Sequence, residues 1–307
     1  MKLFISVFAI ILSTNASIAQ TDTTISKSSV PIEMLFPQGK TKALVLSYDD
    51  GKIEDRQLVK LLNEYGLKGT FHLNSNKLGT NGYLTKAEIK ELFAGHEVSA
   101  HSANHPALTT LSKIDVVYEV VEDRKALELL MGYPVRGMAY PFGNHDESVI
   151  EAIKGLGIDY ARTVDDTHNF KIPENFLKWH PTVHHFAKAF WKADDMENDK
   201  KELAQFYNLI HDFIDTKELA VMDIWGHSWE FSSKWSEAEK CFKLLANNSD
   251  ILYTTQIDLV DYINAFHNLR VSVEKNMIYN PSSQTIFFKK KDKSFSVLPG
   301  TTLVLAN

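Results

Sequence analysis

Short apolar runs alternate with longer amphipathic stretches along most of the chain. The runs are rich in β-branched and aromatic residues, as buried strands are, and the stretches between them repeat apolar residues with a helical period. Expected strands are 43–48, 69–73, 96–100, about 136–140, 158–162, 219–225 and 251–254; expected helices are 54–65, 85–94, 113–131, 146–156, 199–215, 235–247 and 256–267. This alternation predicts a parallel α/β sheet with crossover helices, closed into a distorted (β/α)7-type barrel.

The pattern changes to period two after Arg270. Alternating segments at 271–273, 285–288, 295–298 and 302–305 are separated by Asn280-Pro281 and Pro299-Gly300, which predicts a small β-rich extension over residues 269–307. We expect it to cap the barrel of residues 40–268, with glycan binding as the alternative. The polar, Thr/Ser-rich segment 20–39 is expected to be a tether into the first strand.

The first nineteen residues have the pattern of a secretory signal peptide. Lys2 precedes an apolar core from Leu3 to Leu12, and small residues follow at Ser17-Ile18-Ala19. No later stretch is apolar over the roughly eighteen residues that a spanning helix needs. We therefore expect an exported protein, periplasmic or secreted, without stable membrane insertion. Its single cysteine, Cys241, cannot form an intrachain disulfide.

Charge excludes one class of partner. The chain has 33 basic and 39 acidic residues, a formal net charge of −6. Basic residues do not gather into the footprint that nucleic-acid binding requires.

A carboxylate pair, Asp49-Asp50, ends the first apolar run and precedes Gly51. A strand that ends in two adjacent carboxylates can direct one at a metal ion and leave the other to handle a proton beside it. The simpler interpretation is a turn, since Asp and Gly are both turn formers.

A histidine pair, His101 and His105, follows about fifty residues later. On a helical turn, two imidazoles four positions apart share one face, and with one carboxylate they give the open three-ligand site of catalytic zinc. Chance is the alternative, because the chain has 12 histidines.

Together these motifs resemble the polysaccharide deacetylases, also called NodB-homology or carbohydrate esterase family 4 proteins. The resemblance spans roughly residues 40 to 265 and implies the barrel of that family. It rests on four segments in the family's order: Ser47-Tyr48-Asp49-Asp50-Gly51, His101-Ser102-Ala103-Asn104-His105-Pro106, Tyr140-Pro141-Phe142-Gly143 and Trp225-Gly226-His227-Ser228.

The resemblance implies roles for individual residues. Asp50, His101 and His105 would hold one divalent ion, most simply Zn²⁺, although Co²⁺, Ni²⁺ or Fe²⁺ also suits this ligand set. Asp49 would take a proton from water on the metal. The metal and a backbone N–H near Tyr140 would together stabilise the oxyanion.

The late histidine, His227, would protonate the leaving group; the alternative is a buried structural histidine. The acidic residue that tunes this histidine in the family has three candidates here, Asp165, Asp166 and Asp223.

One position departs from the family. Ala139 stands where the third motif carries an arginine that orients the base. Arg136 comes too early in the chain, whereas Arg162 ends the expected strand 158–162, so we expect Arg162 to supply this group.

Aromatic residues near the motifs fit a saccharide groove. We expect Tyr140 and Trp229 to touch the substrate, with Pro141 and Phe142 beside them. A second histidine-rich stretch contains His180, His184 and His185, and could line the groove or bind another metal weakly. We expect it to be a surface loop.

These features predict a metal-dependent hydrolase that removes acetyl groups from a carbohydrate polymer or oligosaccharide. N-acetyl groups are favoured over O-acetyl groups, since amide hydrolysis dominates in the family. The alternatives are a non-catalytic glycan-binding protein that retains the barrel and a hydrolase of small non-peptide amides.

Overall fold

Eight parallel strands form the central sheet. The computed structural model describes residues 31–186, 196–232 and 234–305. The strand order is β6-β5-β4-β3-β2-β8-β7, and β9 also pairs with β2. The strands are β2 (Lys42–Asp50), β3 (Thr70–Leu73), β4 (Glu97–Ala100), β5 (Gly137–Ala139), β6 (Tyr160–Arg162), β7 (Val183–His184), β8 (Ala220–Gly226) and β9 (Ile251–Thr254).

The sheet curls into a half-barrel, which confirms the predicted architecture. One edge of β2 pairs along its length with β8, and the other pairs first with β9 and then with β3. The segment after β6 spans the opposite side of the curl: Trp179 pairs with Arg162 of β6, while Val183 and His184 pair with β8. These pairings draw the two sides of the sheet together.

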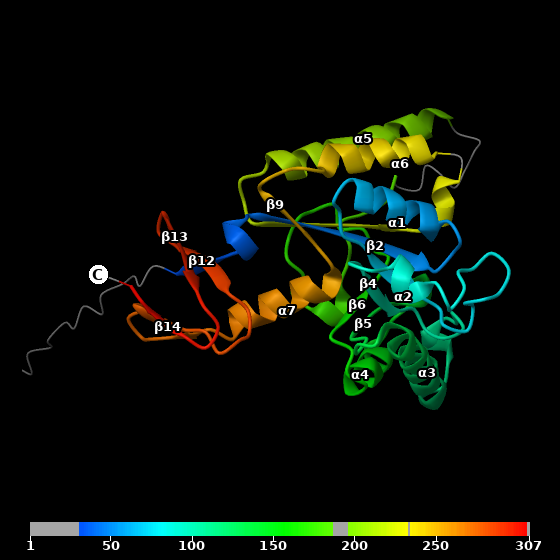
Figure 1. Ribbon diagram of the computed structural model, residues 1–307, viewed down its shortest axis with the longest axis horizontal. Coiled ribbons are helices and arrows are strands. Elements are labelled where there is room, and N and C mark those ends of the chain that lie inside the picture. Colours follow the sequence, from blue (N-terminus) through cyan, green and yellow to red (C-terminus); the bar gives the residue numbers. More distant parts are fainter. Residues whose placement is uncertain (1–30, 187–195, 233, 306–307) are drawn as a thin grey trace, which may run out of the picture.

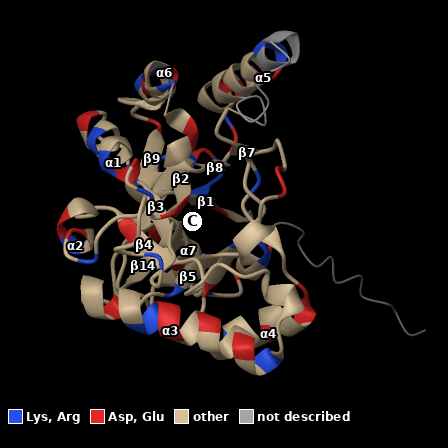
Figure 2. Cartoon of the chain, turned by 90° about the vertical axis from the view of Figure 1, so that its right-hand side faces the viewer, with Lys and Arg blue, Asp and Glu red and all other residues tan. Residues whose placement is uncertain are grey.

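Helices surround the sheet, and Figure 2 looks onto the side toward which β2 points in Figure 1. The helices are α1 (Asp55–Glu64), α2 (Ile89–Leu92), α3 (Lys113–Met131), α4 (Glu147–Gly155), α5 (Met196–Asp215), α6 (Trp235–Leu245) and α7 (Gln256–His267). Local signals set their ends. The Ser112 side chain accepts the Asp115 N–H at the start of α3, and Gly132 ends this helix with a φ of 80°.

The inward face of the sheet changes character along the strands. In β2, Ala43 and Val45 are apolar, whereas Ser47 and Asp49, on the same face, are polar. On one face of β8, the apolar Val221 is likewise followed by the polar Asp223. The interior is therefore apolar at the amino ends of the strands and polar at their carboxyl ends, the usual place for the chemistry of a parallel barrel.

The C-terminal extension forms two small antiparallel sheets, and the chain's N-terminal segment contributes to one of them. The first contains β1 (Ile32–Leu35), β12 (Ile286–Lys290) and β13 (Lys293–Val297); the second contains β10 (Arg270–Val271), β11 (Met277–Tyr279) and β14 (Thr302–Val304). The tether prediction is thus wrong for residues 32–35, because β1 pairs along β12.

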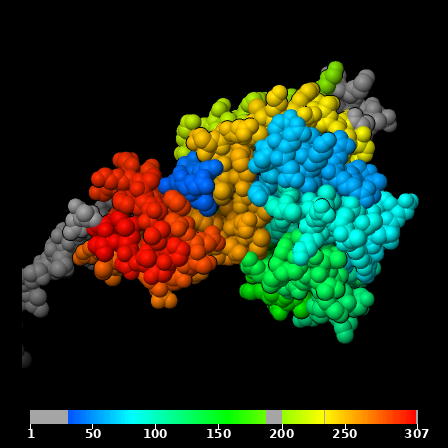
Figure 3. Space-filling view, in the orientation of Figure 1, coloured from blue at the N-terminus to red at the C-terminus, as the bar shows by residue number. Residues whose placement is uncertain are grey.

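The extension lies at the amino-terminal end of the barrel. Figure 3 shows it as a separate lobe that joins the rest of the molecule through α7 and the segment around β1. Phe36 and Phe288 bury their rings in one cluster with Val45 of β2 and Tyr262 of α7. This position agrees with the predicted capping role and is far from the carboxyl ends of the strands.

Most expected elements are present, with small shifts at their ends. The expected helix 85–94 is reduced to α2, and β11 was not predicted. The expected signal peptide and the tether up to residue 30 lie outside the described residues. No helix in the described part of the chain combines the length and apolarity that crossing a membrane requires.

Candidate active site

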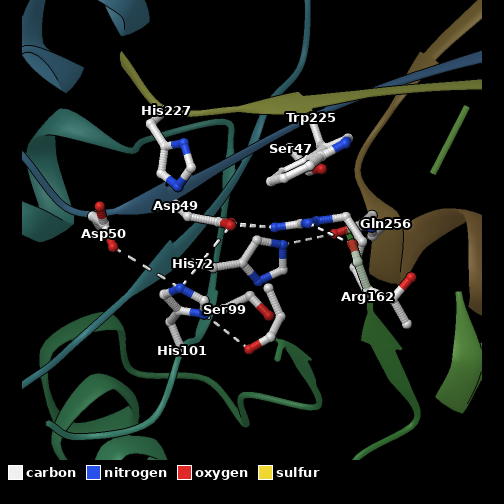
Figure 4. A network of polar contacts seen from close by, with 12 residues as sticks. Ser47, Asp49, Asp50, His72, Ser99, His101, Arg162, Trp225, His227 and Gln256 are labelled. Carbon is white, nitrogen blue, oxygen red and sulfur yellow. Dashed lines mark hydrogen bonds and ion pairs between the residues drawn. The ribbon is translucent and has the colours of Figure 1, made fainter. Parts of the chain in front are cut away.

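Side chains from the carboxyl ends of four strands meet at one place. Asp49 and Asp50 end β2, His101 follows β4, Arg162 ends β6 and His227 follows β8; Figure 4 shows all of them around one polar space. The parallel topology accounts for this meeting, because the carboxyl ends of all strands face the same side.

The side chains of Asp50, His101 and His105 form a group that could hold a metal ion. Nε2 of His101 lies 3.9 Å, and Nε2 of His105 lies 3.7 Å, from Oδ1 of Asp50. Nδ1 of His101 donates to the carbonyl of Ala139 at 2.9 Å, which leaves the Nε2 lone pair directed toward Asp50. The residues therefore fit a divalent ion with two nitrogen ligands and one oxygen ligand.

Neutral imidazoles are needed for such a site. Burial, helped by the nearby His101, lowers the pKa of His105 to about 4, so this ring is neutral at pH 7. The second oxygen of Asp50, Oδ2, accepts the indole N–H of Trp229 at 3.2 Å. One carboxylate oxygen is thus held in place while the other faces the two rings.

The histidine pair lies in an irregular loop, so the prediction of a helical turn was wrong. His105 has a φ of 63° and Ser102 the same value, in the left-handed region. Buried partners hold this conformation. Asn74 donates to the carbonyls of His101 and Ser102, and Asp123 accepts the N–H of His101 at 2.8 Å.

The predicted base, Asp49, lies against Arg162. Both carboxylate oxygens of Asp49 accept from Nη2 of Arg162, and both side chains are buried. Burial alone would raise the pKa of Asp49, but the Arg162 guanidinium, helped by His101 and other histidines, holds it well below the ordinary value. Asp49 is therefore ionised, 4.0 Å from Nε2 of His101.

Arg162 lies beside Ala139, the position at which the resemblance places the motif arginine. Arg162 of β6 and Ala139 of β5 are partners in the register of these two strands. The side chain of an arginine at position 139 would therefore begin next to that of Arg162. The Arg162 guanidinium also stacks over the Trp225 ring, 4.7 Å from its centroid, and donates to the carbonyl of Thr163. These contacts fix its orientation.

The late histidine, His227, is paired with an acid that the sequence analysis missed. Nδ1 of His227 lies 3.0 Å from Oε1 of Glu230, and Oε2 of Glu230 lies 3.3 Å from Nε2 of His184. Burial works against the charged imidazole, but the Glu230 contact outweighs it and raises the pKa of His227. The signal was an acid three residues after the histidine, at the start of a short helix.

The three acids proposed for this role have other partners. Asp166 accepts the indole N–H of Trp225 and the backbone N–H of His184. Asp223 accepts from Ser47, and Asp165 lies 3.6 Å from a ring nitrogen of His180.

The aromatic residues divide differently from the prediction. Tyr140 and Pro141 are buried, and the Tyr140 hydroxyl donates to the carbonyl of Leu177, so the expected substrate contact of the Tyr140 ring is wrong. Phe142 is 61% exposed and lies edge-on to the His105 ring, with the centroids 4.6 Å apart. Phe142 and Trp229 are the rings of this set that border the metal group.

The histidine-rich stretch is only partly a surface loop. His180 is exposed as expected, whereas His184 and His185 are buried. His185 lies among aromatic rings, and its Nδ1 contacts the Tyr48 hydroxyl at 2.8 Å.

Part of the chain is similar to known proteins. Residues 37–161 match the polysaccharide deacetylase family. A peptidoglycan-N-acetylglucosamine deacetylase from Listeria monocytogenes is 30% identical over 138 residues, which cover 44% of this chain and 28% of the relative. A chitin deacetylase from Colletotrichum lindemuthianum is 29% identical over 167 residues, 52% of this chain and 63% of the relative. Each match spans less than two thirds of the relative.

The fold also resembles a solved structure. The crystal structure of a candidate polysaccharide deacetylase from Mycobacterium smegmatis superposes with a TM-score of 0.60 and 14% identity. The match covers 78% of this chain and 96% of that one. It extends the likeness in fold beyond the matched residues 37–161.

Proposed function

We propose that this chain, which carries a polysaccharide deacetylase domain, removes acetyl groups from a carbohydrate by hydrolysis that depends on one divalent metal ion. The observation that carries the proposal is the meeting of Asp50, His101 and His105 beside an ionised Asp49, with His227 across the same space. Peptidoglycan and chitin deacetylases among the relatives support the substrate class.

The ion would be held by Nε2 of His101, Nε2 of His105 and a carboxylate oxygen of Asp50. Two nitrogens and one oxygen suit Zn²⁺ best, and Co²⁺, Ni²⁺ or Fe²⁺ also fit. When bound, such an ion supplies Lewis acidity to water and to the acetyl carbonyl.

Asp49 is proposed to be the general base. Its carboxylate is ionised by its contact with Arg162 and lies within reach of the same space as the metal ligands. It would accept a proton from the attacking water. Arg162 would keep the carboxylate in one orientation, because its own guanidinium is fixed by Trp225 and Thr163.

The backbone N–H that meets the oxyanion would belong to Phe142. The N–H of Tyr140 is used in the sheet, where it donates to the carbonyl of Arg162 at 2.9 Å, and Pro141 has no N–H. The next amide in the motif is therefore that of Phe142, beside His105.

His227 would act as the general acid. Its contact with Glu230 favours the protonated ring, which can give a proton to the departing amine or alkoxide. We favour N-acetyl over O-acetyl substrates, because an amine leaving group needs this proton more than an alkoxide does.

The test is acetate release from chitooligosaccharides, peptidoglycan and acetylxylan by the purified protein. The protein is stripped with a chelator and then reloaded with Zn²⁺ or Co²⁺. We expect release that is lost on chelation and restored by the metal, with an Asp49→Asn chain as the matched inactive control. No release from any substrate by metal-loaded protein would favour glycan binding without catalysis.

We also propose export through the N-terminal segment. The support is its sequence, with Lys2, an apolar core from Leu3 to Leu12 and small residues at Ser17-Ile18-Ala19. Expression with the full leader should yield an extracytoplasmic protein whose first residue is Gln20. Retention of Met1 in a cytoplasmic product would contradict export.

A further inference from the structure

A second group of metal-ligand side chains lies beside the proposed catalytic space. Among the described residues, two groups bring three such ligand atoms within 4.8 Å of one another, and the second contains His184, His227 and Glu230. We propose that this group is a second cation site, selective for Zn²⁺-type ions. The proposal goes beyond deacetylation and does not depend on it.

The donor atoms lie close enough together to turn toward one ion, since a ligand atom of each residue is within 4.8 Å of the other two. Oε1 of Glu230 lies 3.0 Å from Nδ1 of His227, and Oε2 lies 3.3 Å from Nε2 of His184. In a tetrahedral site with zinc–ligand bonds of about 2.0–2.1 Å, neighbouring ligand atoms are about 3.3 Å apart. Two imidazoles and one carboxylate leave one position for water, a set that disfavours Mg²⁺ and Ca²⁺.

The backbone holds the three ligands in place. His184 pairs with Trp225 in the sheet, and its N–H donates to Asp166 at 3.0 Å. The N–H of His227 donates to Oε2 of Glu230 at 3.0 Å. A Cβ on Gly226 would lie 3.2 Å from Oε2 of Glu230 and 3.6 Å from Nε2 of His184, so the glycine keeps this space clear.

Burial makes a neutralising partner necessary. The side chains of His184 and Glu230 are 5% and 4% exposed, whereas that of His227 is 15% exposed and provides the open side. A buried carboxylate is costly unless a proton-bearing group or a cation faces it. A divalent ion between these three side chains would supply that charge.

The second site would regulate the first. An ion bound at this group would separate Nδ1 of His227 from Oε1 of Glu230, so the residue proposed as the acid would lose the contact that holds its ring. Zinc would then activate the enzyme at low concentration through Asp50, His101 and His105 and inhibit it at higher concentration. This consequence rests on the proposed function, whereas binding itself does not.

The experiment measures zinc stoichiometry on the chelator-stripped protein by calorimetry and elemental analysis. Wild type should bind one ion for each of the two groups. His184→Gln and His101→Gln chains should each lose one ion, and the double variant should bind none. His211→Gln, on the exposed surface of α5, is the control and should keep wild-type stoichiometry.

Two further readouts keep the result independent of folding and of turnover. Circular dichroism and thermal melting report whether the His184→Gln chain is folded. Co²⁺ added to the His101→Gln chain should give visible absorption from a site with two nitrogen ligands, and His184→Gln in the same chain should abolish it. Saturation of wild type at one ion, or an unchanged stoichiometry in folded His184→Gln, would overturn the site even if deacetylation is established.

Discussion

Arg162, at the end of β6, donates to both carboxylate oxygens of Asp49, at the end of β2. The two strands are separated in the sheet by β5, β4 and β3, so the contact crosses the inside of the curl. In the chain order of the family motif the arginine would come from position 139. We propose that Arg162, the in-register partner of Ala139 on the next strand, takes its place here.

Arg162→Ala should therefore lower kcat by about 100-fold without removing the metal, because Asp49 loses its orientation. Ala139→Arg in the same chain should restore part of the rate, since the new guanidinium starts beside the vacated space. Arg56→Ala, which removes an exposed ion pair with Glu88, is the control. If the chain with both Arg162→Ala and Ala139→Arg were no faster than Arg162→Ala alone, the proposal that Arg162 replaces an arginine at position 139 would be wrong.

Substitutions of Asp49 and of Asp50 should have different effects on metal binding and turnover. Asp50→Ala should lose the ion and turnover together, because Asp50 supplies the only carboxylate of its metal group. Asp49→Asn should keep the ion and lose about 100-fold or more in kcat, the typical contribution of general-base catalysis. Metal analysis and acetate release on the same samples measure both. Full activity of Asp49→Asn would exclude its role as the base.

The sequence predicted the regular elements well where local signals are strong. The helices α3 and α7 and the strand β9 begin and end where the pattern placed them. Ser112 and Thr255 cap the starts of the two helices with hydrogen bonds to the backbone three residues on. Such caps and the periodicity beside them are contained in a short stretch of sequence.

Elements that depend on distant partners were harder to predict. The segment 32–35 follows a polar, Thr/Ser-rich stretch and forms β1 only by pairing with β12, more than two hundred residues later. The loop 101–105 has the spacing of a helical turn, but Ser102 and His105 have positive φ values, and Asn74 and Asp123 hold the backbone at the start of the loop. Neither partner is visible in the local pattern.

The site shows the same division. Arg162 could be predicted because a strand end fixes where its side chain begins. Glu230 was missed, because its spacing from His227 is a signal only where a helical turn starts at that histidine, and the fold shows that it does. The segment Tyr140-Pro141-Phe142-Gly143 also does not predict which of its two rings is exposed. Tyr140 is buried, whereas Phe142, with a φ of 59°, is exposed.

The Glu230–His227 pair should matter most for poor leaving groups. Glu230→Gln keeps a hydrogen-bonding side chain but removes the charge that raises the pKa of His227. We expect kcat/KM to fall about 100-fold on an N-acetyl substrate and far less on an activated aryl acetate, which leaves without a proton.

His227→Ala should show the same dependence on the leaving group, and Glu91→Gln, on the exposed surface of α2, should show none. Rates on both substrates at low Zn²⁺ avoid any effect of a second ion. Equal losses on the two substrates would assign both residues a structural role.

Stability should fall in acid partly because of His185, whose burial among aromatic rings lowers its pKa to about 3. An unfolded chain protonates this ring near its ordinary pKa of about 6.5, so the unfolded state binds more protons between the two values. The stabilisation is therefore complete above pH 6.5 and is lost as the pH falls toward 3.

Between pH 7.5 and 5.0 this one group should lower the free energy of unfolding by about 2 kcal/mol, at about 1.4 kcal/mol per pKa unit. His185→Gln, which retains a partner for the Tyr48 hydroxyl, should show a pH dependence smaller by that amount in urea unfolding. The His211→Gln variant, at an exposed position of α5, is the control and should follow wild type. The same slope in His185→Gln and wild type would mean that His185 is protonated in the folded protein, which its apolar surroundings argue against.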